Sequence, residues 1–371
     1  MSKQIHYNID NISQEKANFN LIYGEKSNGK SYQVKHKKGI LPYLEKQEKE
    51  KIIENALVND ERFILLRRWK EDISNLWIEQ YFSDVDVEKL TNGKYNCISC
   101  YRKVLYLSIY DVEQAKIKRY EKIGYAMALS TEQHYSGGSF LDVKRIIFEE
   151  FMERGSYIPN EPDKLMTLYS TIDRKRGTTE LWMVGNSISR VCPYISAWGL
   201  DEIFRTIKQG EIKTKIIHNE NNDVKIAVEY CRASGGKTMA IGNASSMIDK
   251  GGWQTHPQPK LPKSRNAYKC KYRFGFQYKN FKFMCEYLID LEDKQTCFFI
   301  YPKYTEFKKG TIIFSDVVKV DRHWQRDIYN ISIPNDKMKK FFQMFKENMI
   351  FYSSDLCGTD FKQVKDFEIR R

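Results

Sequence analysis

Long apolar segments are missing from this sequence. It contains no run of about 18 consecutive apolar residues, the length expected of a membrane-spanning helix, so it predicts no such helix. Residues 1–5 also lack the apolar core of a signal peptide. We therefore expect an intracellular protein.

Metal-binding patterns of cysteine and histidine are scarce. Of eight cysteines, only Cys97 and Cys100 form a C-x-x-C pair, and neither a second pair nor a histidine stands at zinc-binding spacing. A metal or redox role for this pair is the alternative. Ordinary reduced thiols are favoured, as is usual inside a cell.

Acidic residues are outnumbered by basic ones. The 371 residues include 61 Lys and Arg against 48 Asp and Glu, which gives a formal net charge of +13. This excess points to a polyanionic partner, and nucleic acid is favoured over a membrane surface because no amphipathic anchor is evident. A basic protein without such a partner is the alternative. The length suggests two domains.

The central motif lies in residues 19–31, where an apolar strand is followed by G-x-x-x-x-G-K-S. The two glycines let backbone N–H groups point at phosphate oxygens, and the N-terminus of the following helix faces the same spot. Lys30 is predicted to reach the β- and γ-phosphates of ATP, and Ser31 to contact Mg²⁺. A turn before a basic surface helix is the alternative. The predicted nucleotide-binding residues of this loop are Gly24, Ser27, Asn28, Gly29, Lys30 and Ser31.

A second motif places two acids at the end of an apolar strand. Residues 146–148 are Ile-Ile-Phe, and Glu149 and Glu150 follow directly. In a protein with a phosphate loop, the first acid holds the magnesium shell and the second polarises the attacking water. We therefore predict a metal-supporting role for Glu149 and a catalytic role for Glu150. A pair of surface glutamates is the alternative.

Three polar residues downstream are further candidates. Arg174 and Arg176 follow a helix predicted over residues 165–172, and either could offset charge on the γ-phosphate bound by a neighbouring subunit. DNA contact and a solvated turn are the competing interpretations. Asn186 ends a strand predicted over residues 181–184 and is the candidate sensor of the γ-phosphate, with a turn-forming role as the alternative.

Three further residues permit more than one interpretation. Arg67 and Arg68 follow a buried strand predicted over residues 63–66, on the ligand side of an open α/β sheet. They could meet phosphate or DNA, or form surface ion pairs. Tyr7 precedes the first strand and could stack on adenine or pack in the core.

Residues 19–195 resemble the DNA-packaging (encapsidation) ATPases of small tailed phages with protein-primed genomes, which are relatives of terminase large subunits. The Y-I-P-N-E run at residues 157–161 is far more specific than a generic ATPase motif. The other matching positions are residues 24–31, 63–70 and 146–151, Arg174, Arg176, Asn186-Ser187 and Pro193-Tyr194.

The resemblance implies a RecA-like P-loop ATPase domain of the ASCE class over residues 1–200. It implies a homo-oligomeric ring, expected to be a pentamer, on the portal vertex of an empty prohead in the host cytoplasm. This ring translocates double-stranded DNA with ATP and Mg²⁺, and whether a packaging RNA joins it is left open. The resemblance also implies an arginine finger acting in trans at Arg174 or Arg176, and a catalytic basic residue at Lys26. Glu149 departs from the family, which usually has Asp there.

A linker is expected over residues 201–265, which are rich in Lys and Asn, and a smaller α+β domain over residues 266–371. In terminases the second domain is an RNase H-like nuclease, which needs several acids around metal. The candidate strand over residues 296–301 carries no acid. We predict a degenerate RNase H-like domain without nuclease activity that binds DNA, portal or RNA. Of the nearby acids, Asp290, Glu292 and Asp293 share a predicted turn, and Asp316 and Asp321 stand apart from them.

Three other functions remain open from the sequence. One is a nucleotide-binding scaffold that assembles at the portal without turning over ATP. Another is a helicase-type translocase, whose ATPase activity single-stranded DNA would stimulate. The third is a terminase-type nuclease.

Overall fold

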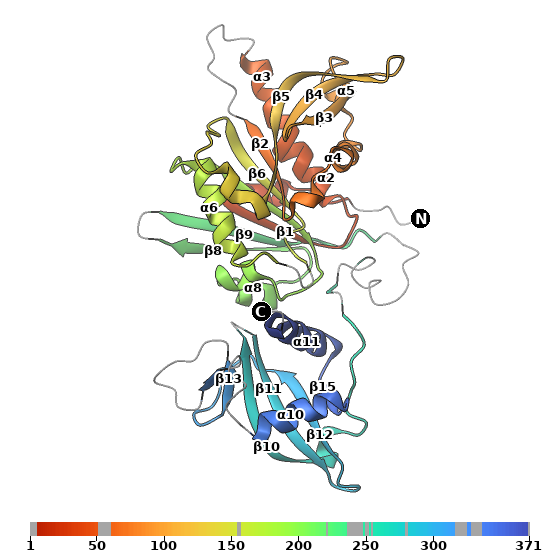
Figure 1. Cartoon of the computed structure of the whole chain (residues 1–371), viewed down its shortest axis with the longest axis vertical. Coiled ribbons are helices and arrows are strands. Elements are labelled where there is room, and N and C mark those ends of the chain that lie inside the picture. Colours follow the sequence, from red (N-terminus) through yellow and green to blue (C-terminus); the bar gives the residue numbers. More distant parts are fainter. Residues whose placement is uncertain are drawn as a thin grey trace. The chain divides into compact units, whose positions relative to one another are not determined.

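The computed structural model of the chain describes residues 6–50, 61–153, 157–219, 222–235, 248, 252–253, 255–278, 281–315, 325–327 and 336–369. The chain forms two compact units (Figure 1). The first comprises residues 1–188, 192–240 and 245–252, and the second residues 189–191, 241–244 and 253–371. The Asp316 and Asp321 positions lie outside the described residues.

The first unit is built on one mixed sheet with the strand order β3-β4-β5-β2-β6-β7-β1-β9-β8. The strands β5, β2, β6, β7, β1 and β9 run parallel to one another, while β4 and β8 are antiparallel to their neighbours. The central strands are almost continuously apolar, as expected of strands buried on both faces. Their bounds are β1 (Phe19–Gly24), β2 (Arg62–Arg67), β6 (Val143–Glu149), β7 (Glu180–Asn186) and β9 (Asp223–Tyr230).

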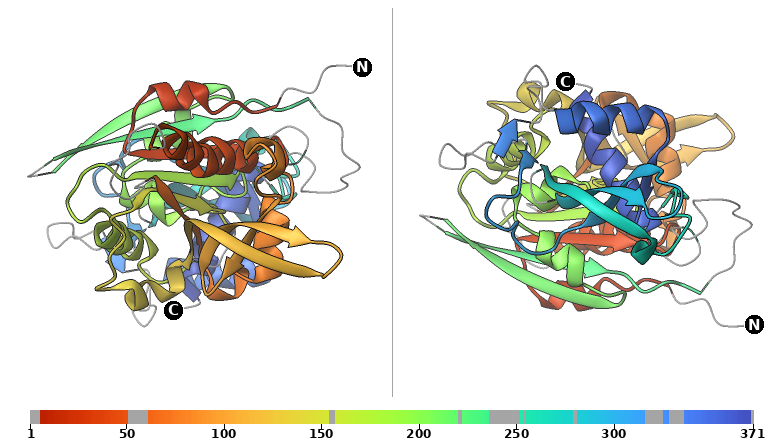
Figure 2. Two further views of the ribbon diagram at one scale, coloured as in Figure 1. Left: turned by 90° about the horizontal axis from the view of Figure 1, so that it is seen from above. Right: turned by 90° about the horizontal axis from the view of Figure 1, so that it is seen from below.

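Helices cover both faces of this sheet (Figures 1 and 2). On one face, Val34, Tyr43 and Ile78 join a core with Ile22, Phe63 and other strand residues. On the other face, rings from the helices contact rings from the strands, as in the pairs Tyr169–Phe19, Tyr194–Phe148 and Phe204–Tyr23. The first group comprises α1 (Asp10–Gln14), α2 (Lys30–Val34), a π-helical turn (Lys35–Ile40), α3 (Leu41–Glu50), α4 (Asn75–Phe82) and α5 (Val87–Leu90). The second comprises α6 (Glu161–Asp173), α7 (Pro193–Ala197) and α8 (Asp201–Thr206).

The two ends of the sheet are formed by different parts of the chain. At one end, β3 (Cys97–Tyr101), β4 (Val104–Asp111) and β5 (Lys116–Ala128) form an antiparallel arm. At the other end, β8 (Glu211–His218) pairs with β9, and β9 pairs with β1. Residues 201–230 therefore contribute α8, β8 and β9 to the first unit, whereas the sequence analysis assigned them to a linker.

The second unit has a six-stranded sheet with the order β14-β13-β10-β11-β12-β15. β10 and β11 pair antiparallel. Aromatic side chains from β10, β11 and β12 pack against Phe341 and Phe361 of two helices, and these rings form the core of the unit. The strands are β10 (Tyr268–Tyr278), β11 (Phe281–Asp290), β12 (Thr296–Pro302), β13 (Ile313–Ser315), β14 (Gln325–Asp327) and β15 (Ile350–Tyr352), and the helices are α10 (Asp336–Lys346) and α11 (Asp355–Ile369).

The cysteine pair and the acids of the second unit can now be placed. Cys97 and Cys100 lie three residues apart on β3, so their side chains leave opposite faces of the strand, and both are free thiols. Lys263 Nζ forms ion pairs with Asp290 at 2.9 Å and Glu292 at 2.7 Å. Within the described residues, no group of three or more His, Cys, Asp or Glu side chains could hold a metal ion. Those residues also include no helix that is long and apolar enough to cross a membrane.

Candidate active site

The glycine-rich loop connects the end of β1 to the start of α2. Gly29 has φ +93° at the N-terminus of α2, and Ser27 has φ +64°. A Cβ atom at Gly24 would lie 3.1 Å from Cβ of Cys231, so glycine permits the close approach of the segment after β9. The loop therefore has the curled backbone that the sequence motif predicts.

The side chain of Lys30, the first residue of α2, bonds to residues of this loop. Its side chain is buried, with the residue only 4% exposed, and burial lowers the pKa of its amine. Nζ donates to the backbone carbonyl of Glu25, to Asn28 Oδ1 at 3.0 Å and to Asn186 Oδ1 at 3.4 Å. Among the described residues no carboxylate forms an ion pair with this amine. The Glu149 and Glu25 carboxylates still act on the amine electrostatically, but its direct contacts are to uncharged oxygens.

Ser31 and Glu149 meet at the first turn of α2. The Ser31 hydroxyl donates to Glu149 Oε2 at 2.9 Å, and the Tyr81 hydroxyl donates to Glu149 Oε1 at 2.7 Å. Burial raises the pKa of the Glu149 carboxyl, while these two hydrogen bonds oppose the rise. The structure therefore brings the predicted metal-supporting pair together. Tyr81, from α4, is a site residue that sequence reasoning missed.

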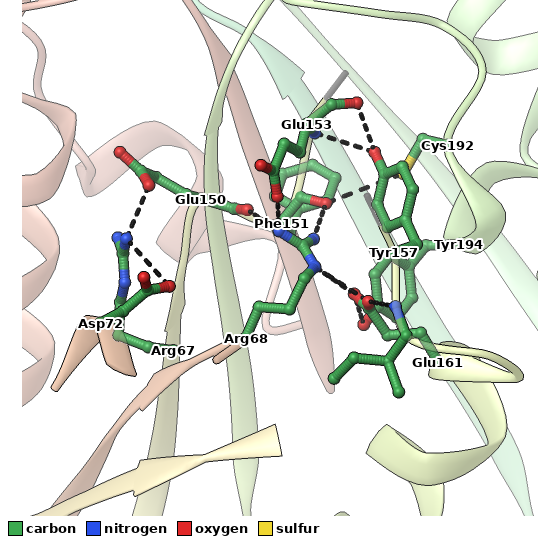
Figure 3. A network of polar contacts seen from close by, with 11 residues as sticks. Arg67, Arg68, Asp72, Glu150, Phe151, Glu153, Tyr157, Glu161, Cys192 and Tyr194 are labelled. Atoms are coloured by element: carbon green, nitrogen blue, oxygen red, sulfur yellow. Dashed lines mark hydrogen bonds and ion pairs between the residues drawn. The ribbon is translucent and has the colours of Figure 1, made fainter. Parts of the chain in front are cut away.

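Glu150 follows the last residue of β6 in a left-handed backbone conformation, with φ +59°. Its side chain is 58% exposed, and it accepts from Arg67 Nη2 at 2.8 Å (Figure 3). Arg67 also lies over the ring of Trp77, at 4.9 Å. A non-glycine residue held at positive φ is uncommon, and such strain is found at functional sites. Arg67 thus forms an ion pair with the predicted catalytic acid.

Arg68 forms a buried network beside this pair (Figure 3). Its Nε lies 2.8 Å from Glu161 Oε2, and its Nη1 lies 2.7 Å from Glu153 Oε2. The guanidinium also donates to the carbonyls of Glu150 and Phe151, at 3.1 and 2.9 Å. Tyr194 donates to Glu161 Oε1 at 2.7 Å. The ion-pair interpretation of Arg68 is correct, but the pair is buried and fixes the backbone on which Glu150 sits.

Arg174 and Arg176 lie at the opposite edge of the sheet. Nη2 of Arg176 donates to the carbonyl of Val143, the first residue of β6, whereas Lys30 begins α2, after the loop that leaves the last residue of β1. Arg174 is exposed, and its guanidinium donates to the Gly138 carbonyl at 2.6 Å. The Arg176 guanidinium donates over 2.7–3.0 Å to the carbonyls of Leu141, Val143, Ile172 and Asp173.

The remaining predicted residues can be placed briefly. Asn186 ends β7 and faces Lys30, as expected for a residue at the tip of the neighbouring strand. Lys26 is exposed in the loop. Tyr7 is buried in the core, where its hydroxyl donates to Glu229 Oε2 at 2.7 Å, so the packing interpretation is correct.

These features define an α/β protein with a glycine-rich turn between a central parallel strand and a helix, and with Glu149, at the end of a nearby strand, bonded to the first turn of that helix. More particularly, the chain belongs to the podovirus DNA encapsidation protein (Gp16) family, whose family model matches residues 1–283.

Individual relatives are more distant. The chain is 26% identical over 208 residues to the DNA packaging protein of Bacillus phage phi29, covering 54% of this chain and 52% of that protein. It is 27% identical over 189 residues to the DNA packaging protein of Bacillus phage B103, covering 49% and 48%. The chain thus spans about half the length of the curated relatives it matches.

The fold also has a counterpart among solved structures. A chain of the bacteriophage phi29 viral genome packaging motor assembly matches with a TM-score of 0.52 and 17% sequence identity. The match covers 98% of this chain and 99% of that chain. It supports the mixed α/β architecture.

Proposed function

We propose that this protein is the ATPase of a phage DNA-packaging motor, which hydrolyses ATP to move double-stranded DNA into a preformed prohead through the portal. The observation that carries the proposal is the meeting of Lys30, Ser31 and Glu149 at the ends of β1 and β6. Family membership supports the packaging role.

The buried amine and curled backbone of the glycine-rich loop suit the phosphates of a nucleoside triphosphate. A buried ammonium group is costly unless an anion is nearby, and the contacts of Lys30 Nζ are all to uncharged oxygens. Phosphate oxygens would supply that anion. Gly24, Ser27, Asn28 and Gly29 shape the loop, and Lys26 adds an exposed charge at its rim.

The Ser31 hydroxyl and the Glu149 carboxylate suit Mg²⁺, which prefers oxygen ligands. When bound, the ion would neutralise charge on the β- and γ-phosphates. Tyr81 fixes the second oxygen of Glu149 and so orients the first. The longer side chain of Glu149, compared with Asp, fits this contact with Ser31.

Glu150 would accept a proton from the water that attacks the γ-phosphorus, as the bond to the leaving ADP oxygen breaks. In the structure its carboxylate faces Arg67, so we infer that a change at this ion pair accompanies catalysis. Asn186 would sense the γ-phosphate beside Lys30.

An arginine from a neighbouring subunit would complete the site. Arg174 and Arg176 lie at the far edge of the sheet from Lys30, which supports action in trans rather than in the same chain. Arg174 is the better candidate, because it is exposed and the Arg176 guanidinium is held by backbone carbonyls. Action in trans requires that subunits assemble, and the family resemblance implies that they form a pentameric ring.

Strand order supports the finer fold assignments. In the first unit, β2-β6-β7-β1-β9 places the sensor strand between the phosphate-loop strand and the acidic strand, as in a RecA-like ASCE ATPase. In the second unit, the first three strands in sequence, β10, β11 and β12, are antiparallel. β13 then pairs parallel with β10, and β14 pairs parallel with β13, as in an RNase H-like sheet. We propose that this second unit lacks nuclease activity and binds DNA, portal or a packaging RNA.

Substitution of the catalytic acid tests the proposal. Glu150→Gln should lower DNA-stimulated ATP hydrolysis by about 10²- to 10⁴-fold, because the amide cannot take a proton from water, while ATP still binds. Glu153→Gln is the matched control, since Glu153 is also a partly exposed acid in an ion pair, with Arg68 rather than Arg67. Turnover and packaging by Glu150→Gln at the wild-type level would favour an assembly scaffold. Stimulation by single-stranded but not duplex DNA would favour a helicase-type translocase.

A further inference from the structure

The arm formed by β3, β4 and β5 has one face with no role in the site described above (Figures 1 and 2). Ile98, Leu105 and Leu107 point from its other face into the core beneath α4 and α5. Because strand residues alternate between faces, Tyr101 leaves β3 on the outer side. The figures show the β4–β5 hairpin extending away from the helices.

Tyr101 is the centre of a small cationic cluster on this outer face. Its side chain is 47% exposed. The guanidinium carbons of Arg102 and Arg119 lie over its ring, at 5.2 and 5.0 Å from the centroid. Within the described residues neither guanidinium forms an ion pair. Two exposed arginines are therefore held in place by an aromatic ring, and no carboxylate neutralises them.

The turn beside this cluster is also unusual. Tyr101 pairs with Val104, so Arg102 and Lys103 form a two-residue hairpin loop, and their φ angles are +48° and +67°. Such loops strongly favour Asn-Gly, because both central residues need positive φ. Here two long basic side chains occupy these positions, although they fit the turn poorly. The hairpin loop thus carries two exposed basic side chains at positions where the backbone conformation favours Asn or Gly.

The surrounding surface has the same sign of charge. Residues 97–122 contain six basic side chains and three acidic ones. Of the acids, Glu121 already binds Lys94 Nζ at 2.5 Å and the Tyr95 hydroxyl at 2.6 Å. The basic residues are Arg102, Lys103, Lys116, Lys118, Arg119 and Lys122.

We propose that the cluster of Tyr101, Arg102 and Arg119, which we call the arm cluster, contacts the phosphate backbone of duplex DNA. This inference rests on the proposed function and adds a surface that grips the DNA. Arginine guanidinium groups match phosphate geometry, and ordering them on a ring lowers the cost of binding. Because guanidinium groups already lie over the ring, the cluster offers charge rather than an open aromatic face for an unpaired base.

Salt-dependent binding tests the proposal. The full-length protein, held with a non-hydrolysable ATP analogue, is titrated with duplex DNA, single-stranded DNA and duplex RNA at several salt concentrations. For Arg102→Gln/Arg119→Gln, the slope of log affinity for duplex DNA against log salt should become shallower by about 1.8, the effect of two lost phosphate contacts. Tyr101→Leu should weaken binding, and Tyr101→Phe should retain it because the ring suffices.

Lys89→Gln/Lys208→Gln is the matched control, since it removes two exposed charges from the first unit outside the arm. An equal effect of both double variants, or an unchanged slope for the cluster variant, would overturn the proposal while leaving the motor function standing. A loss confined to duplex RNA or to single-stranded DNA would also overturn it. If the wild type fails to bind duplex DNA at all, the proposed motor function fails as well.

Discussion

At the scale of single residues, the candidate site contains groups proposed to face a nucleotide and other groups that hold them in position. Lys30, Ser31 and Glu149 converge directly. Arg68 and Tyr81 instead fix the backbone and side chains of the two acids. The convergence was predictable because the ends of parallel strands meet at one edge of a sheet. The contact between Arg68 and Glu161 could not be predicted, because the two residues are 93 positions apart and no local sequence pattern connects them.

Substitutions of the two arginines after α6 should affect different properties of the protein. Arg174→Ala should lower ATP turnover of the assembled protein by about 10³-fold or more, with stability little changed, because its guanidinium acts on the neighbour's γ-phosphate. Arg176→Ala should instead lower the free energy of unfolding by about 1–3 kcal/mol, since several carbonyls lose their donor, among them those of the buried residues Val143 and Ile172. Turnover assays and urea unfolding measure the two effects.

Mixing experiments then test action in trans. Lys30→Ala and Arg174→Ala subunits, each inactive alone, should regain part of their activity when combined, because some interfaces pair an intact nucleotide site with an intact arginine. Absence of complementation, or a stable and fully active Arg174→Ala protein, would contradict the assignment.

Glu229 should make stability depend on pH. Burial raises the pKa of its carboxyl from 4.5 to about 7, while the hydrogen bond from Tyr7 opposes the rise. The unfolded chain ionises first, so the native state loses stability relative to the unfolded state as pH rises from 4.5 to 7. The loss should be about 2–3 kcal/mol.

Glu229→Gln should remove this part of the pH dependence. The difference in free energy of unfolding between wild type and variant, measured in urea at pH 4.5 and pH 7.5, isolates the contribution from that of other carboxylates. A difference that is constant over this range would show that the carboxyl titrates normally.

At the scale of elements, continuous apolar runs predicted the central strands well. Residues 63–66, 146–148 and 181–184 all lie in β2, β6 and β7, because strands buried on both faces leave little room for polar residues. β8 was missed, since it is an edge strand with no fully buried residue, and its mixture of lysines and other polar residues resembles a polar linker. β9 was missed with it, although its last residues are buried beside β1.

The strained turn between β3 and β4 gives a prediction at this scale. Arg102→Asn/Lys103→Gly should raise the free energy of unfolding by about 1 kcal/mol or more, because both residues then suit positive φ. The same variant should bind duplex DNA more weakly, since it removes part of the arm cluster. Chemical unfolding and DNA titration of one preparation measure both effects. A less stable variant would show that the basic side chains themselves support the turn, as the hydrogen bond from Lys103 Nζ to the Ile73 carbonyl at 3.3 Å allows.

At the scale of the whole molecule, two units share one basic chain. The first carries the phosphate loop, the acids and the arm cluster, and the second has its own aromatic core. Composition alone predicted a polyanionic partner from the net charge of +13. Composition did not indicate which surface bears the charge, because that depends on how β3, β4 and β5 align in space.

The most direct test measures the ATP hydrolysis rate per subunit against protein concentration, with and without duplex DNA. A site completed by a neighbour's arginine predicts that the specific rate rises steeply as subunits assemble, and that duplex DNA increases it further. A specific rate that is independent of concentration and unaffected by duplex DNA would contradict the account of an assembled, DNA-driven motor.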